Sequence, residues 1–314
     1  MTVSVLLLLF ITLPISIISF IFFQKYFILN NYIDNINQRS SHNTVATRSG
    51  GIAILFSIFT VSTFFYLTGK EIYNFSILIP LIILALVGLY DDLNKLDFKL
   101  KFLFQIVVAK LFIDNGYIID NLHGLLNFFE INRIIAQLLT IFIVVAIINS
   151  INFIDGIDGL AITLVALFII LFEFFSNDTS NLYFFSIIIL SSVLPLYYFN
   201  FKKSKKIFLG DCGSMFLGGI VSVYVLTILT NSYIIKPQYD LHKIIFVISL
   251  LSYPIIDIVR IFFLRILNSK SPFEADKNHI HHRILSRTRD NHFLTSLIIL
   301  IFSIIVLVIL QILF

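Results

Sequence analysis

The chain has 314 residues, of which 58% are hydrophobic and 13% charged, and its formal net charge is +4 at pH 7. Its mean hydropathy is +0.98, and since roughly a quarter of the residues in soluble domains are charged, a water-soluble fold is excluded. A disordered chain lacks apolar residues, and a disulfide scaffold needs cysteine pairs, whereas Cys212 is the single cysteine. We therefore expect an integral membrane protein that forms one domain over residues 1–314, with no nucleic-acid partner.

Apolar runs recur along the whole chain, and a helix needs about 20 such residues to cross roughly 30 Å of hydrocarbon. They predict an all-α polytopic bundle of about ten transmembrane helices, or eleven. The fourth run is short and contains Lys110 and Asp114. A β-barrel would need alternating segments of about ten residues, which the continuous run 141–148 does not match. The predicted spans are 2–23, 51–67, 75–90, 102–114, 133–151, 160–175, 182–200, 212–230, 242–263 and 293–314.

Basic residues are concentrated on one side of this predicted topology. If the N-terminus lies outside, 17 of the 22 lysines and arginines fall in or beside the inner loops 24–50, 91–101, 152–159, 201–211 and 264–292. Cytoplasmic loops are enriched in basic residues. We therefore expect both termini to face outward and the inner loops to lie at the cytoplasmic face of the cell inner membrane.

Four polar clusters lie in these inner loops, and the first is the pair Asp91 and Asp92. Adjacent carboxylates at a membrane interface repel each other and lose hydration, so they need a cation or a proton between them. A divalent metal, or a phosphate-bearing substrate with its metal, would supply that charge; a solvated helix end is the alternative. The lysines that follow, Lys95, Lys99 and Lys101, are equally well explained as topology determinants.

The second cluster is the segment 149–160, in which amide and carboxylate side chains recur every third residue. If the segment is helical, these side chains lie on one face, and their oxygens suit a hard cation such as Mg²⁺. Gly156 and Gly159 would let a phosphate or another backbone approach closely. Asp-Gly pairs are also common in turns, which is the alternative. The four side chains are Asn149, Asn152, Asp155 and Asp158.

The third cluster, 208–214, places Asp211 between glycines at a predicted helix N-terminus. Asp211 could bind a metal there while neighbouring N–H groups face an anion, or it could simply cap the helix. Cys212 is expected to be a small packed residue.

The fourth cluster, 271–283, has three histidines within four residues, but they lack the i, i+4 spacing of a helical zinc site. With Lys277 and Arg283 beside them they suit phosphates better, although an ordinary polar loop is the alternative. Together the four clusters predict Mg²⁺-assisted chemistry on a phosphorylated substrate.

The ordered motifs resemble those of the polyprenyl-phosphate N-acetylhexosamine-1-phosphate transferases. That family includes initiating transferases of O-antigen, enterobacterial common antigen and teichoic acid linkage units, and translocase I of peptidoglycan synthesis. The resemblance spans about residues 39–285 and includes Arg48-Ser49-Gly50-Gly51, where Thr47 replaces the family's proline. The other motifs are Asp-Asp (91–92), Asn-x-x-Asn-x-x-Asp-Gly-x-Asp-Gly-Leu (149–160), Phe-Leu-Gly-Asp-x-Gly-Ser (208–214) and Ser-Pro-Phe-x-x-Asp-x-x-His-x-His-His (271–282).

The resemblance implies transfer of a sugar 1-phosphate from a UDP-sugar to undecaprenyl phosphate, with release of UMP and with Mg²⁺, or Mn²⁺ in its place, as cofactor. It implies that Asn152 and Asp211 hold the metal. Asp91 would act as base, orienting group or nucleophile at the lipid phosphate, and Asp92 would support it. The implied substrate-binding residues are Lys101 at the acceptor phosphate, Asn149, Asp155 and Asp158 on the nucleotide side, and His279, His281, His282 and Arg283 at the pyrophosphate or sugar.

Three alternatives compete with this reading. Within the family, translocase I typically has three consecutive histidines, so the sequence His279-Ile280-His281-His282-Arg283 favours a UDP-N-acetylhexosamine donor over transfer of phospho-N-acetylmuramoyl-pentapeptide. A transporter would place charges near the bilayer midplane, whereas Lys110 and Glu173 lie near the ends of predicted helices. A CDP-alcohol phosphotransferase would space its aspartates differently. The family implies contact with membrane lipids and allows a homodimer, and the sequence leaves the sugar and the glycan pathway open.

Overall fold

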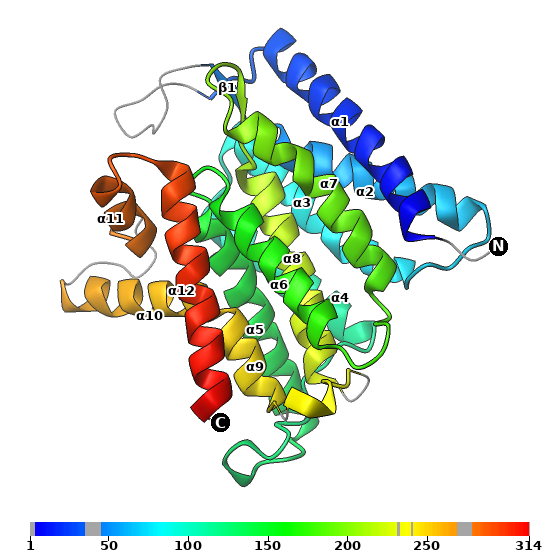
Figure 1. Cartoon of the computed structure of the whole chain (residues 1–314), viewed down its shortest axis with the longest axis vertical. Helices are drawn as coiled ribbons and strands as arrows, with labels where there is room; N and C mark the ends of the chain where they lie inside the picture. Colours follow the sequence, from blue (N-terminus) through cyan, green and yellow to red (C-terminus); the bar gives the residue numbers. More distant parts are fainter. Residues whose placement is uncertain (1–3, 35–44, 231–232, 240, 269–277, 314) are drawn as a thin grey trace.

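The computed structural model describes residues 4–34, 45–230, 233–239, 241–268 and 278–313, with nothing said of the side chain of Leu126. These residues form a bundle of α-helices with one short two-stranded sheet (Figure 1). The α-helices are α1 (Val5–Leu29), α2 (Gly50–Leu67), α3 (Leu78–Asn94), α4 (Phe98–Asp114), α5 (Arg133–Ile154), α6 (Leu160–Phe175), α7 (Tyr183–Asn200), α8 (Gly210–Leu229), α9 (Lys243–Leu250), α10 (Ser252–Leu267), α11 (Ile280–Arg287) and α12 (His292–Leu313). The strands are β1 (Ala46–Thr47) and β2 (Lys206–Ile207), and the 3₁₀ turns are η1 (Phe75–Ile77), η2 (Leu125–Asn127) and η3 (Pro237–Tyr239).

The all-α prediction is confirmed, and helical structure occupies each of the ten predicted spans. Seven helical segments in the described part of the chain are long and apolar enough to cross a bilayer, and the bent pair α9–α10 would make an eighth. The helices α4 and α6 have 17 and 16 residues, somewhat fewer than a perpendicular crossing requires. About ten spans is thus an approximate description of the bundle.

The predicted ninth span, 242–263, is wrong as a single helix. The chain breaks at Leu251, and α9 and α10 meet at an angle of 72°. Pro254 lies in the first turn of α10. Because a proline has no N–H to donate to the preceding turn, the helical hydrogen bonds of α9 cannot continue past this residue. As a result α10 points sideways out of the bundle in Figure 1.

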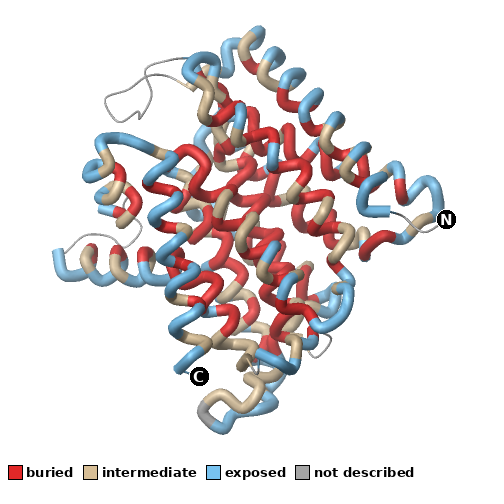
Figure 2. Tube along the Cα trace, viewed as in Figure 1, coloured by how far each residue is buried: buried red, intermediate tan, exposed pale blue. Residues whose placement is uncertain are grey.

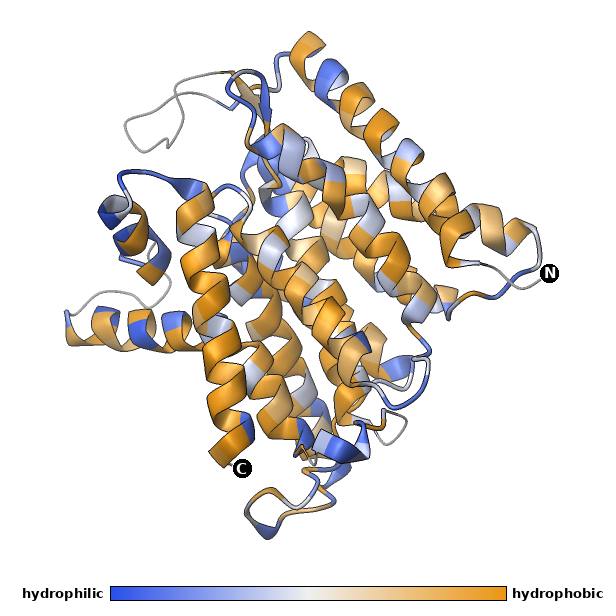
Figure 3. Ribbon diagram, viewed as in Figure 1, coloured by the Kyte–Doolittle hydropathy of each residue, from blue (hydrophilic) through white to orange (hydrophobic). Residues whose placement is uncertain are grey.

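Helix α8 forms the centre of the bundle, as the buried residues in Figure 2 show. In its apolar window 94% of residues are buried inside the protein, against 28% in each of α1 and α12. The two outer helices therefore present most of their surface to the surroundings, and Figure 3 shows that this surface is hydrophobic. Outward-facing apolar side chains are what a helix in contact with lipid requires.

Two close backbone contacts fix the start of α8 next to the start of α2. The amides of Gly50 and Gly51 donate to the carbonyls of Phe208 and Leu209 at 3.0 and 2.9 Å. A Cβ on Gly51 would lie 2.1 Å from the amide nitrogen of Gly213, so only glycine allows this approach. The parallel pair β1–β2 continues the junction by joining the residues before α2 to those before α8.

The outer helices α1 and α12 both have one end beside the inner loops. Near the end of α1, the Gln24 side chain donates to the carbonyl of Lys205 at 2.6 Å, beside β2. At the start of α12, His292 contacts Asp158, in the loop between α5 and α6. The first residues of α1 and the last residues of α12 therefore lie at the opposite end of the bundle from these loops.

Candidate active site

A lysine between two carboxylates forms the centre of the polar region where α3, α4 and α8 meet. Lys101 Nζ, near the start of α4, contacts Asp91 Oδ2 of α3 and lies 2.8 Å from Asp211 Oδ2 of α8. The Asp91 carboxylate also accepts a hydrogen bond from the Leu96 amide at 2.6 Å. We call Asp91, Lys101 and Asp211 the carboxylate–lysine cluster. The first and third polar clusters, more than a hundred residues apart in sequence, are thus brought to one point, as the sequence predicted.

Asp92 lies beside this cluster but points into the protein. Its side chain is 0% exposed, and its two carboxylate oxygens accept hydrogen bonds from the amides of Asp211 and Cys212 at 3.1 and 2.9 Å. The amides at a helix N-terminus lack partners within the helix, and a carboxylate there also complements the helix dipole. Asp92 therefore caps α8 and holds Asp211 in place, and its predicted catalytic part stays a prediction. Arg48 adds positive charge, 3.4 Å from Asp92 and 3.0 Å from Asp34.

The predicted asparagines lie on α5 and face different neighbours. Asn152 Nδ2 donates to Ser214 Oγ of α8 at 2.8 Å, which ties it to the turn that carries Asp211. Asn149 forms a reciprocal amide pair with Gln105 of α4, with nitrogen–oxygen distances of 2.7 and 3.3 Å. Asn152 thus adjoins the carboxylate–lysine cluster, while Asn149 joins α4 to α5 one turn away.

Of the two alternatives for 149–158, the helical face holds only as far as Ile154, and the turn applies beyond it. Helix α5 ends there, Asp155 is its C-cap residue, and Gly159 has a φ of +79°, a conformation that L side chains rarely adopt. Asp155 still lies close to the cluster. Burial, reinforced by the negative charges of Asp211, Asp92 and Asp158, raises the pKa of Asp155 well above its ordinary value.

Asp158 is held by groups that the sequence did not connect with it. Its carboxylate lies 2.5 Å from Lys206 Nζ of β2 and 3.4 Å from His292 Nδ1 of α12, and only 6% of its side chain is exposed. The Asp158 amide also donates to His292 Nδ1 at 3.0 Å. Asp158 therefore anchors the α5–α6 loop from both sides, and its predicted contact with the nucleotide stays a prediction.

The predicted histidines lie at the start of α11 and reach the same loop. His279 is 6.0 Å from the ring of Phe153 and 5.2 Å from that of His281. A Cβ on Gly156 would lie 3.1 Å from His281 Nε2 and 3.4 Å from His282 Nε2. Arg283 is exposed. The motif residues 271–277, including Asp276 and Lys277, lie outside the described residues.

Two functional candidates on α10 were missed from the sequence. Asp257 is 0% exposed and accepts from His279 Nδ1 at 2.6 Å, and the Tyr253 hydroxyl lies 3.0 Å from His281 Nδ1. Asp257 could have been predicted, because a carboxylate inside an apolar span is costly and marks a functional site. Tyr253 carried no such signal, since a tyrosine in an apolar run is ordinary.

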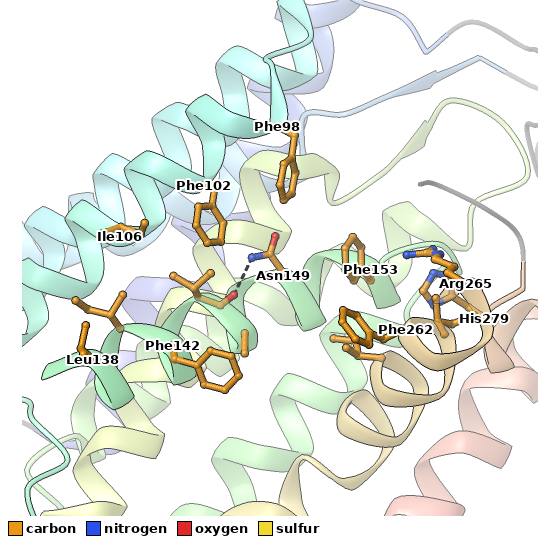
Figure 4. Close-up of a pocket in the computed structure, with 15 residues that line it drawn as sticks. Phe98, Phe102, Ile106, Leu138, Phe142, Asn149, Phe153, Phe262, Arg265 and His279 are labelled. Carbon is orange, nitrogen blue, oxygen red and sulfur yellow. Dashed lines mark hydrogen bonds between the residues drawn. The ribbon is translucent and has the colours of Figure 1, made fainter. Parts of the chain in front are cut away.

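An apolar groove opens beside the polar cluster, between α4, α5 and α10 (Figure 4). Its volume is about 470 Å³. Phe98 and Phe102, which flank Lys101 in sequence, line it from α4, and its polar groups are Asn149, Arg265 and His279. Several walls face outward, for Leu138 and Phe142 are 63% and 70% exposed. The groove therefore joins a lipid-facing surface to the polar region.

The side chains of the cluster suit a hard cation. Asp91 and Asp211 offer carboxylate oxygens that converge on one point, now held by the ammonium of Lys101. Asn152, with its amide nitrogen committed to Ser214, offers a carboxamide oxygen. Oxygen ligands of this kind are those that Mg²⁺ prefers.

Comparison with known proteins shows the family of this chain. The family model of glycosyl transferase family 4 matches residues 74–229. A "probable undecaprenyl-phosphate N-acetylglucosaminyl 1-phosphate transferase" of Bacillus subtilis is 31% identical over 260 residues, which are 81% of this chain and 70% of the relative. The chain belongs to glycosyl transferase family 4. The resemblance inferred from the four motifs is thereby confirmed.

Other similar proteins match over similar lengths. The undecaprenyl-phosphate alpha-N-acetylglucosaminyl 1-phosphate transferase of Salmonella typhi is 29% identical over 81% of this chain and 69% of its own. The decaprenyl-phosphate N-acetylglucosaminephosphotransferase of Mycobacterium leprae is 28% identical over 79% and 68%. The matched family region contains the carboxylate–lysine cluster and the α5–α6 loop but ends before α10 and the histidines.

Proposed function

We propose that this protein transfers N-acetylhexosamine 1-phosphate from a UDP-sugar to a polyprenyl phosphate, undecaprenyl phosphate in the first instance. The named relatives act on undecaprenyl or decaprenyl phosphate and carry N-acetylglucosamine in their names. The observation that carries the proposal is the convergence of Asp91, Lys101 and Asp211 beside an apolar groove. This arrangement would let phosphate chemistry take place beside a bound lipid chain.

The acceptor lipid is proposed to lie in the groove between α4, α5 and α10. A polyprenyl chain is apolar, and each buried CH₂ contributes about 0.8 kcal/mol, so a long groove wall of phenylalanine and aliphatic side chains favours it. The phosphate would then emerge near Phe98 and Phe102, next to Lys101 on the same helix. An ammonium at that point attracts a phosphate as a point charge.

In the proposed reaction an oxygen of the acceptor phosphate forms a bond to the β-phosphorus of the UDP-sugar. The bond from that phosphorus to the oxygen shared with the α-phosphorus breaks, and UMP leaves. Both reactants are anions, so catalysis consists mainly of positioning and of screening charge. Mg²⁺ held by Asp211 and Asn152, with Asp91 near, would supply that screening. A phosphate monoester is largely dianionic near pH 7, its second pKa being about 6, so Asp91 is needed to orient the acceptor more than to deprotonate it.

The remaining charged groups fit supporting parts in this scheme. Arg48 lies where it can meet a phosphoryl group, since it is 45% exposed at the edge of the cluster. Asp155 would stand on the nucleotide side of the α5–α6 loop, which Asp158 anchors. We place the site at the cytoplasmic face, because the loops around it hold most of the basic residues.

The alternatives are less well supported. The names of the relatives favour an N-acetylglucosamine donor over the muramoyl pentapeptide of translocase I. A transporter would need free intramembrane charges, but Glu173 accepts hydrogen bonds from Ser180 and Ser186 at 2.9 and 2.5 Å.

The direct test uses the purified protein reconstituted with undecaprenyl phosphate, Mg²⁺ and labelled UDP-N-acetylhexosamines. We expect release of UMP and a labelled lipid product with at least one donor. Asp91→Asn and Lys101→Gln should lose at least about 100-fold in kcat, as expected for groups that place reacting atoms.

The chain offers matched controls on the far part of α4. Lys110 and Asp114 form an exposed ion pair, with side chains 49% and 56% exposed, so Lys110→Gln and Asp114→Asn remove the same charges away from the cluster. Both should stay within about twofold of the unmodified protein. The proposal fails if no donor yields UMP, or if the control substitutions inactivate the protein as strongly as those in the cluster.

A further inference from the structure

The histidines of α11 are held by two side chains of α10 that lie one helical turn apart. Asp257 Oδ2 is 2.6 Å from His279 Nδ1, and the Tyr253 hydroxyl is 3.0 Å from His281 Nδ1. The second oxygen of Asp257 accepts from the amide of Ile280 at 2.7 Å. Asp257 therefore fixes both the ring of His279 and the first turn of α11.

These bonds determine which ring nitrogen carries a proton. A carboxylate only accepts, so Nδ1 of His279 is the donor in its bond with Asp257. Burial, helped by the nearby His282, lowers the pKa of His281 to about 3, so His281 is neutral at physiological pH. When the Tyr253 hydroxyl donates to His281 Nδ1, the proton of the neutral ring is on Nε2.

The Nε2 atom of His281 is buried and has no hydrogen-bond partner among the described residues. It faces Gly156, where a Cβ would stand 3.1 Å from it, and His282 Nε2 would be 3.4 Å from the same point. A buried donor without a partner is unfavourable, and the α5–α6 loop that it faces belongs to the candidate active site. An anionic oxygen brought to this loop would satisfy it.

We propose that Tyr253 and Asp257 are positioning residues. Tyr253 fixes the ring of His281 so that its Nε2 faces a phosphoryl or sugar oxygen of the donor substrate, and Asp257 holds His279 and the first turn of α11, which carries His281. The inference rests on the proposed function, because it needs a UDP-sugar bound beside the α5–α6 loop. It adds two residues that never touch the substrate but decide how the histidines meet it. In metal sites, residues of this kind often orient the histidines that bind the ion.

The test compares Tyr253→Phe with Tyr224→Phe. Both tyrosines are 1% exposed or less, and the Tyr224 hydroxyl pairs with Ser186, far from the site. Each substitution removes one buried hydroxyl. We expect Tyr253→Phe to lower kcat/KM for the UDP-sugar about tenfold, the equivalent of one hydrogen bond, with KM for polyprenyl phosphate changed less than twofold. Tyr224→Phe should leave both parameters within twofold.

A double-substitution experiment separates positioning from mere stability. A glutamine carboxamide can place an N–H near the position of Nε2 without needing a partner at Nδ1. We therefore expect His281→Gln to keep more activity than His281→Asn, and Tyr253→Phe to have no further effect on kcat/KM in the His281→Gln protein. Asp257→Asn, which offers an N–H to His279 Nδ1 and reverses its tautomer, should lose about 100-fold, whereas Asp114→Asn should not.

Each other outcome overturns the inference. It is wrong if Tyr253→Phe lowers activity only in proportion to folded protein, or if it affects donor and acceptor kinetics alike. It is also wrong if the purified protein holds an equivalent of zinc that Asp257→Asn releases, since Asp257, His279 and His281 have possible ligand atoms within 4.8 Å of one another. If the unmodified protein releases no UMP from any donor, the proposed function itself has failed.

Discussion

Gly88 is the point at which α3 meets the start of α8, and replacing it tests how closely the position of Asp211 controls the reaction. A Cβ at residue 88 would lie 2.3 Å from the carbonyl oxygen of Asp211 and 2.6 Å from the amide nitrogen of Cys212. Both are backbone atoms, which cannot rotate away as a side chain can. Gly88→Ala must therefore push the first turn of α8 away from α3.

The size of the displacement follows from the contact distance. Cβ atoms essentially never lie closer than 3.0 Å to another heavy atom, so the 2.3 Å contact requires a shift of at least about 0.7 Å. A misplacement of about 1 Å can cost about 100-fold in rate, and overpacking costs about 1–3 kcal/mol in stability. We expect kcat to fall between about 10- and 100-fold while the protein remains folded.

The assay measures UMP release and thermal unfolding in detergent for Gly88→Ala beside Gly219→Ala. Gly219 lies at the same helix pair, but there the Cβ would meet only the side-chain ends of Leu84 and Leu81, at 2.5 and 2.8 Å. Those ends can move, and they are farther along α8 than the site. If both variants keep the same kcat at equal folded amounts, the placement of Asp211 does not limit the reaction and the reasoning is refuted.

Four further predictions concern the cap, the groove, the histidine and the metal. Asp92→Ala, which removes both oxygens that accept from the Asp211 and Cys212 amides, should lower stability by about 1 kcal/mol, the value of a helix cap, and reduce kcat with little change in either KM, as steady-state kinetics will show. Ala146→Phe, which fills part of the groove, should raise KM for polyprenyl phosphate several-fold and leave KM for the UDP-sugar unchanged. Since the pKa of His281 is about 3 in the fold and about 6.5 in an unfolded chain, stability is complete above pH 6.5 and is lost as the pH falls from there toward 3. His281→Gln should therefore avoid about 2 kcal/mol of the destabilisation measured between pH 7 and pH 5, and an equal loss in both proteins would contradict this pKa. Treatment with EDTA should abolish UMP release and added Mg²⁺ should restore it, whereas full activity in EDTA would exclude the metal.

The helices and the gathering of the motifs could be read from the sequence because both depend on composition. Long apolar runs leave the backbone no alternative to helices in a bilayer, and the uneven charge distribution placed 91–92, 149–158, 211 and 279–283 at one end. The contacts of Lys101 on α4 with Asp91 on α3 and Asp211 on α8 confirm that grouping for these three helices. The assigned chemical roles remain predictions.

What the sequence did not predict depends on three-dimensional partners. Asp92 and Asp91 are adjacent and identical in type, yet one caps α8 and the other faces Lys101, because successive residues on a helix point about 100° apart. Asp158 appeared to continue the spacing of α5, but the partners that hold it, Lys206 and His292, come from β2 and α12. No local pattern records such long-range pairs.

The bend at Leu251 brings α10 beside both the proposed donor site and the proposed lipid groove. A straight continuation of α9 would carry the 16 residues of α10 roughly 24 Å farther along the bundle at 1.5 Å per residue. With the 72° bend, α10 instead passes beside α5 and presents one buried row at i, i+4 spacing. The row consists of Tyr253, Asp257, Ile261 and Arg265. Its first two members hold the histidines, and its last two line the groove. A single helical face therefore contacts both the proposed donor site and the proposed lipid groove, so a shift of α10 would change both at once.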